Sequence, residues 1–146
     1  MKTYRTYSSL ETKQLGRRAA HELLERQGGR ALVIALRGDL GAGKTTFTQG
    51  FLGALGITKR VPSPTFVIMK RYRIRHAHFA NAHHMDAYRL RKADDAGPLG
   101  FDAILKDPQN IVLVEWPENI TGALPRGTKN IRFTYGKKEN ERVIRY

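Results

Sequence analysis

Residues 38–45 read Gly38-Asp39-Leu40-Gly41-Ala42-Gly43-Lys44-Thr45 and fit the G-x-x-x-x-G-K-[ST] pattern of a phosphate-binding loop. The apolar run 31–36 before this loop predicts a buried β-strand, and residues 46–55 after it predict an α-helix. This order suits phosphate binding, because the loop N–H groups and the helix N-terminus both offer unpaired donors to an anion. The sequence therefore predicts a nucleotide phosphate site at this loop.

The loop residues have different expected roles at such a site. Lys44 would reach the β- and γ-phosphates, and the Thr45 hydroxyl would bind Mg²⁺. The residues of this segment that we expect to contact the nucleotide are Gly41, Ala42, Gly43, Lys44, Thr45 and Thr46.

A loop of this class also needs an acidic residue that holds Mg²⁺ or its waters. Glu115 directly follows the apolar run Ile111–Val114, so a buried strand would carry its carboxylate to the rim of the site and make it a metal ligand. Asp86 is the second candidate, since it is the only acid in a long basic stretch. The residues leave three roles open for Asp86: support of Mg²⁺, orientation of the attacking water, or an ion pair with Arg89.

Thr65 is the third candidate for catalysis. It ends the run Val61-Pro62-Ser63-Pro64-Thr65, in which two prolines favour a stiff, extended connector. A threonine in such a loop can sense the γ-phosphate through Mg²⁺, although a turn without a role in catalysis fits the same residues. Trp116 follows Glu115 and would either pack in the core or cover the site. We interpret His83-His84 as strand residues, because they lack the spacing and companion ligands of a zinc site.

Length and composition narrow the class of protein. The chain has 146 residues, which suits a single domain over residues 1–146. It has no cysteine and no apolar run of membrane-spanning length, and its first residues lack the apolar block of a signal peptide. We therefore expect a cytoplasmic protein that does not contact a membrane.

The charge is strongly positive and uneven. The formal net charge is +13, and the stretch 59–92 holds nine Lys or Arg but only one acid. Such a field attracts polyanions, so we expect contact with RNA, or with an acidic protein surface, through the region Lys59–Lys92. A solvated basic surface without a partner fits the same charge pattern.

Other segments predict the architecture. Ser8 and Glu11 form a capping box that begins a helix running toward Gly28-Gly29. Strands are expected at 3–7, 66–72, 78–85 and 111–114, and the pairs 66–72 with 78–85 and 130–135 with 142–146 predict hairpins. Residues 89–106 predict short helices broken at Gly97-Pro98. Together these elements predict an α/β fold, a three-layer P-loop NTPase-like sheet with helices on both faces and an antiparallel C-terminal hairpin.

Four runs now resemble one known family. They are the phosphate loop with its extension to Phe47, Ser63-Pro64-Thr65-Phe66, Met85-Asp86-Ala87-Tyr88-Arg89-Leu90 and Val114-Glu115-Trp116-Pro117-Glu118. Their order and spacing resemble the TsaE (YjeE) family over nearly the whole chain. The resemblance implies a bacterial Mg²⁺-dependent ATPase that takes part in threonylcarbamoyladenosine modification of tRNA. It further implies that the chain binds and resets a TsaD–TsaB transferase complex, which itself transfers the threonylcarbamoyl group.

Carried onto this sequence, the resemblance implies that Lys44 and Thr45 bind the phosphates and Mg²⁺. It implies that Glu115 is the second Mg²⁺ ligand and that Asp86 takes part in hydrolysis. It also sets Thr12, in the N-terminal helix, near the adenine of ATP. The chain departs from the family at Ala87 and at 94–100, where Gly97-Pro98 replaces a helical segment.

Two other functions remain open from the residues. One is a small nucleoside or nucleotide kinase, although residues 122–129 are short for an arginine-bearing lid. The other is a basic RNA-binding module in which ATP is only a conformational ligand, as the charge of 59–92 suggests.

Overall fold

A computed structural model describes residues 1–24, 28–59 and 68–146. The described residues form one seven-stranded sheet in the order β1-β7-β6-β2-β5-β4-β3. The strands are β1 (Thr3–Thr6), β2 (Leu32–Arg37), β3 (Met69–Arg73), β4 (Asn81–Asp86), β5 (Asn110–Glu115), β6 (Lys129–Tyr135) and β7 (Arg142–Arg145). The four central strands β6, β2, β5 and β4 are parallel to one another, and the outer pairs are antiparallel.

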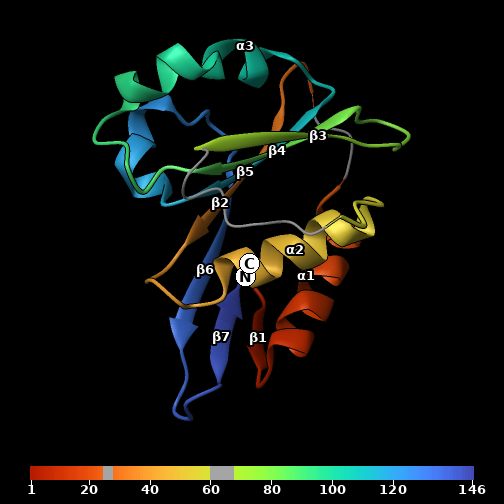
Figure 1. Ribbon diagram of the computed structural model, residues 1–146, viewed down its shortest axis with the longest axis vertical. Coiled ribbons are helices and arrows are strands. Elements are labelled where there is room, and N and C mark those ends of the chain that lie inside the picture. Colours follow the sequence, from red (N-terminus) through yellow and green to blue (C-terminus); the bar gives the residue numbers. More distant parts are fainter. Residues whose placement is uncertain (25–27, 60–67) are drawn as a thin grey trace.

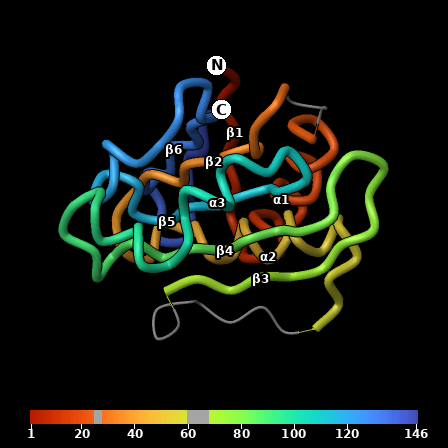
Figure 2. Tube along the Cα trace, turned by 90° about the horizontal axis from the view of Figure 1, so that it is seen from above, coloured from red at the N-terminus to blue at the C-terminus, as the bar shows by residue number. Residues whose placement is uncertain are grey.

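Helices cover both faces of this sheet (Figure 1). The helix α1 (Ser9–Leu23) packs beside α2 (Lys44–Ala54) on one face. The other face is covered by the 3₁₀ segments η1 (Ala93–Leu99) and η2 (Pro117–Ala123) and by α3 (Phe101–Lys106). In the view of Figure 1, α3 lies above the strands β3, β4 and β5 and α2 lies below them, and Figure 2 shows the two ends of the chain close together. The predicted three-layer α/β fold with an antiparallel C-terminal hairpin is thus confirmed.

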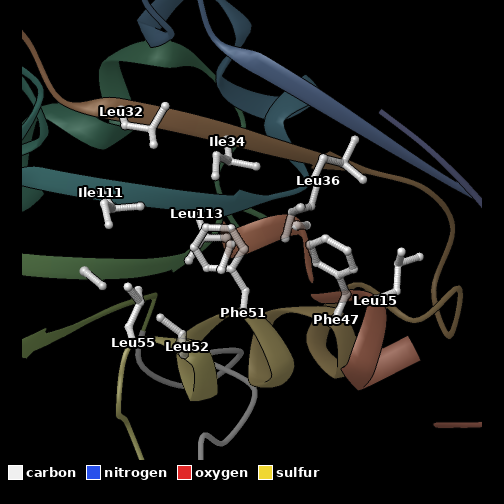
Figure 3. Packing of buried hydrophobic residues seen from close by; sticks show 14 of the residues in the cluster. Leu15, Leu32, Ile34, Leu36, Phe47, Phe51, Leu52, Leu55, Ile111 and Leu113 are labelled. Atoms are coloured by element: carbon white, nitrogen blue, oxygen red, sulfur yellow. The ribbon is translucent and has the colours of Figure 1, made fainter. Parts of the chain in front are cut away.

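Alternation along the parallel strands creates two hydrophobic cores. Leu32, Ile34 and Leu36 of β2 face the helices α1 and α2, together with Ile111 and Leu113 of β5. Figure 3 shows aromatic and aliphatic side chains of α2 filling the space beneath them. The intervening valines of β2 and β5 face the opposite core, which is closed by side chains of η1, α3 and η2. Strands buried on both faces read as continuous apolar runs, which explains the sequence signal of 31–36 and 111–114.

The start of α1 follows the predicted capping pattern with one difference. The Ser8 hydroxyl accepts the backbone N–H of Glu11 at 3.1 Å, as expected for an N-cap. The Glu11 carboxylate accepts the N–H of Tyr7 at 2.8 Å, however, rather than that of Ser8. The helix ends at Leu23, before the glycines at 28–29 that we expected to end it.

Other predictions are confirmed with shifted boundaries. The hairpins β3–β4 and β6–β7 form as predicted, and β7 also pairs with β1, which brings the two ends of the chain together. The prediction of a helix break at Gly97-Pro98 was wrong, because Pro98 lies inside η1 and the break falls at Gly100, where φ is 72°. No described helix is both long and apolar enough to cross a membrane.

Two glycines allow α1 and α2 to approach closely. A Cβ atom at Gly16 would lie 2.1 Å from the carbonyl oxygen of Phe47, and one at Gly50 would lie 2.0 Å from that of Lys13. Both clashes are with backbone atoms, which cannot rotate away. The two helices can therefore pack at this separation only with glycine at both positions.

We predict that Gly50→Ala destabilises the protein by roughly 1–3 kcal/mol or more, because the added methyl group forces α1 and α2 apart. Gly53→Ala on the same helix is the matched control, since its Cβ would meet only the flexible Arg17 side chain at 3.5 Å. That control should gain up to about 1 kcal/mol from helix propensity. Urea unfolding measures both changes. Equal stabilities for the two variants would contradict the close-packing account.

Candidate nucleotide-binding site

The glycine loop joins the carboxyl end of β2 to the first turn of α2 (Figure 1). Gly43 is the N-cap of α2 and has φ of 101°, and Gly41 has φ of 75°. Residues other than glycine rarely adopt these left-handed backbone conformations. The loop can therefore turn directly into the helix, which leaves the N–H groups of the first helical turn for an anion.

Lys44 begins α2, and its side chain is almost fully buried in this loop. Its ammonium group donates hydrogen bonds to the carbonyl oxygens of Gly38 and Asp39, the latter at 2.8 Å, and lies 4.4 Å from the ring centre of Trp116. Burial lowers the pKa of the ammonium group, and the nearby charge of Glu115 opposes this shift. Lys44 is thus a partly desolvated cation held by carbonyl dipoles and an aromatic face.

Glu115 ends β5 beside the first turn of α2. Its carboxylate accepts the Thr45 hydroxyl, with Oγ1 at 3.0 Å from Oε1 and 3.2 Å from Oε2. The side chain is only 4% exposed. Two hard oxygen donors from separate elements, a hydroxyl and a carboxylate, therefore meet at the point where the sequence predicts Mg²⁺.

Asp86 lies at the same level on the neighbouring strand. It ends β4, and its Cα is the register partner of that of Glu115. The carboxylate is buried and accepts the backbone N–H of Tyr88 at 2.9 Å. The parallel pairing of β4 with β5 thus brings the two predicted acids to one edge of the sheet.

These side chains border one small cavity of about 180 Å³. Its lining consists of Leu40, Gly41, Gly43, Lys44, Thr45, Thr46, Asp86, Glu115 and Trp116. The Ala42 side chain is fully buried, and its backbone N–H donates to the carbonyl oxygen of Asp39 within the loop at 3.1 Å, so its contact with the nucleotide stays a prediction. Thr65 lies outside the described residues.

A second hollow of about 420 Å³ lies on the other side of the loop, against the start of α1. Thr12 borders it together with Gly41, Gly43 and Thr46 of the loop segment. The Thr12 hydroxyl is itself engaged, at 2.8 Å from that of Thr6 and 3.1 Å from the carbonyl oxygen of Ser8. The structure therefore brings Thr12 beside the loop, in a hollow that shares Gly41, Gly43 and Thr46 with the cavity bordered by Lys44.

The C-terminal hairpin also reaches the loop, which sequence reasoning missed. The Tyr135 hydroxyl donates to the carbonyl oxygen of Leu40, and the Arg142 guanidinium donates to that of Gly41 at 3.3 Å. The Arg142 guanidinium also lies 4.8 Å from the ring centre of Tyr135. No local pattern indicates these contacts, because they depend on the pairing of β6 with β2.

His84 is a further residue that the sequence analysis left without a role at the site. Its Nε2 atom lies 2.8 Å from Oε1 of Glu115, and both side chains are buried. The signal that could have found it is strand periodicity, since residues 84 and 86 of one strand point to the same face.

Fold and loop together define an α/β protein of the P-loop class. The family model described as "Threonylcarbamoyl adenosine biosynthesis protein TsaE" matches residues 6–144. The chain therefore belongs to the TsaE family, as its four motifs suggested.

Individual relatives agree with this assignment. The tRNA threonylcarbamoyladenosine biosynthesis protein TsaE of Bacillus subtilis is 42% identical over 123 residues, which cover 84% of this chain and 71% of that protein. The protein of the same name from Haemophilus influenzae is 33% identical over 84% of this chain and 75% of its own length. The crystal structure of Bacillus subtilis YdiB matches with a TM-score of 0.76 and 35% identity, covering 98% of this chain and 82% of that one.

Trp116 should report on occupancy of the cavity. It is the only tryptophan of the chain, and its ring contacts the Lys44 ammonium and, at 5.1 Å between ring centres, Tyr88. We predict a saturable change of tryptophan fluorescence on adding a nucleoside triphosphate, because phosphate oxygens would draw Lys44 away from the ring. Lys44→Ala should abolish the change and the exposed Lys106→Ala should keep it. Binding seen by calorimetry without any change of emission would contradict this account.

Proposed function

We propose that this chain is a Mg²⁺-dependent ATPase that serves the threonylcarbamoyladenosine modification of tRNA as an accessory subunit. Its family supports the pathway. The main observation in support of ATPase activity is the hydrogen bond between Thr45 and Glu115 at 3.0 Å, beside the buried ammonium group of Lys44. A phosphate loop, a hydroxyl and an acidic strand end are the parts that phosphoryl transfer to water requires.

The residues present fit Mg²⁺ and ATP. The Thr45 hydroxyl and the Glu115 carboxylate are hard oxygen donors within hydrogen-bond distance of each other, and we assign them to the metal. When bound, Mg²⁺ offsets negative charge on the phosphoryl group that is transferred. Loop residues 41–46 would hold the phosphates, and Thr12 would border the nucleoside.

Within this proposal Lys44 changes its partners on binding. Its ammonium group would exchange the carbonyl oxygens of Gly38 and Asp39 for β- and γ-phosphate oxygens. We assign the buried carboxylate of Asp86 to orientation of the attacking water, since it lies beside Glu115 at the rim of the same cavity. Thr65 keeps its proposed part as a switch residue near the γ-phosphate.

The proposed partner is the TsaD–TsaB complex, which the chain would bind and reset through its ATP cycle. Large apolar side chains are exposed beside the cavity, and they support the proposal that a protein partner binds there. Leu40 in the loop is 78% exposed, and Tyr88 next to Trp116 is 57% exposed. Exposed apolar side chains that gather around a functional cavity are typical of an interaction surface. We also propose a cytoplasmic location, because the pathway modifies tRNA.

We predict that the isolated chain releases phosphate from ATP slowly and that TsaD–TsaB accelerates the release. Lys44→Ala should lower turnover roughly 100-fold or more, because it removes the cation that offsets phosphoryl charge. Exposed Lys106→Ala is the matched control and should keep full turnover. The measurement is free phosphate at saturating ATP and Mg²⁺. Fast turnover that ignores the partners would contradict the accessory role, and phosphate transferred to a nucleoside would indicate a kinase.

A second candidate function, RNA contact, is favoured by the edge strand β3. Its side chains Lys70, Arg71 and Arg73 are exposed, as is the following Arg75. Within the described part of the chain none of these four forms an ion pair. Exposed cations without an ion pair along a sheet edge suit a phosphate backbone.

We predict that the triple variant Arg71→Glu, Arg73→Glu and Arg75→Glu weakens binding of tRNA at least tenfold while sparing ATP turnover, with the salt dependence of binding reduced by roughly 2 to 3 in log–log slope. Filter binding over a salt series measures both quantities. The control reverses the same charge at the exposed Lys106, Arg126 and Arg132. Equal tRNA affinity in wild type and triple variant would exclude RNA binding by β3.

A further inference from the structure

His84 is a fully buried imidazole next to the proposed metal site. It lies on β4 opposite Leu113 of β5, on the face that packs against α2. Its Nε2 atom is 2.8 Å from Oε1 of Glu115, which stands at the end of the neighbouring strand. Burying a polar side chain costs free energy unless it is hydrogen-bonded, and the bond to Glu115 offsets that cost here.

The two carboxylate oxygens of Glu115 have different hydrogen-bond partners. Thr45 donates to both of them at similar distances, 3.0 Å and 3.2 Å. His84 contacts Oε1 alone. The imidazole is therefore the group that makes one oxygen different from the other and fixes the rotation of the carboxylate.

The direction of this bond follows from the chemistry of both groups. A carboxylate only accepts hydrogen bonds, so the Nε2 atom of His84 carries the hydrogen. Within the described part of the chain the other ring nitrogen, Nδ1, has no hydrogen-bond partner. His84 thus directs its one satisfied polar atom at Glu115 and at no other group described.

We propose that His84 is a positioning residue for Mg²⁺, acting through Glu115. By holding Oε1, it fixes the rotation of the carboxylate and leaves Oε2 beside the Thr45 hydroxyl, so that both oxygens could serve the metal or its waters. Residues that hydrogen-bond to a metal ligand commonly orient it and set its affinity in this way. The inference rests on the proposed Mg²⁺-dependent ATPase function and assigns the ring no contact with the metal itself.

Glutamine and asparagine separate positioning from packing. The amide nitrogen of glutamine lies the same number of bonds from Cβ as the histidine Nε2, whereas that of asparagine lies one bond closer. His84→Gln therefore keeps the donor to Glu115, while His84→Asn keeps a polar amide without reaching it. His84→Leu removes the donor and fills most of the volume.

The experiment measures nucleotide affinity by calorimetry with and without Mg²⁺, together with the melting temperature of each variant. We expect His84→Asn and His84→Leu to reduce the gain in affinity due to Mg²⁺ roughly 10- to 100-fold, with little change in affinity without the metal. His84→Gln should recover most of the gain. In a Glu115→Ala background, His84→Leu should add nothing, because its effect passes through that carboxylate.

His83 provides the matched control. It is also buried, but it lies opposite Val112 and faces the core beneath α3, away from the cavity. His83→Gln should leave the Mg²⁺ gain unchanged even where it lowers the melting temperature.

Three outcomes would overturn the inference: an unchanged Mg²⁺ gain in His84→Leu, a glutamine variant as impaired as the asparagine one, or an effect that persists without Glu115. The wild-type measurement distinguishes failure of the His84 inference from failure of the proposed function. A wild-type chain whose nucleotide affinity does not depend on Mg²⁺ would overturn the proposed function, and this inference with it.

Discussion

In the parallel register of β2 and β5, Leu36 lies opposite Glu115, and the rest of the site depends on that pairing. The phosphate loop leaves β2 just beyond Leu36, so its turn into α2 begins at the level where β5 presents a carboxylate. A slip of the register by one residue would send Glu115 to the opposite face of the sheet, away from Thr45. The sizes of the side chains oppose such a slip, because the leucines and isoleucines of the two strands fill one core and their smaller valines fill the other.

The start of α2 is held from three directions, which fixes the loop before any ligand arrives. The glycines at 16 and 50 let α1 press against its middle, and the two phenylalanines of α2 pack beneath β2 and β5 (Figure 3). Tyr135 and Arg142 hold the loop carbonyls from the C-terminal hairpin. A loop with several left-handed glycines would otherwise sample many conformations, so these contacts lower the entropy lost on binding.

Much of the fold could be predicted from residue patterns, because its parallel strands are apolar throughout and its first helix has a clear cap. The same patterns placed Lys44, Thr45, Asp86 and Glu115 correctly at strand and helix ends, where the rules of parallel sheets bring them together. His84 could have been found by alternation from Asp86. The contacts of Tyr135 and Arg142 could not, since they depend on strands far apart in the chain.

The charges at the site bear on the proposed binding of a nucleotide and Mg²⁺. Lys44 brings one positive charge to the cavity, whereas Asp86 and Glu115 bring two carboxylates to the same rim. A triphosphate would add several more negative charges, and burial weakens the hydration that could offset them. If a triphosphate binds here as proposed, loop dipoles and the nearby Arg142 would offset part of its charge, and a divalent cation would offset more. The overall charge of +13 acts in the same direction, because it raises the electrostatic potential through which an anion approaches the cavity.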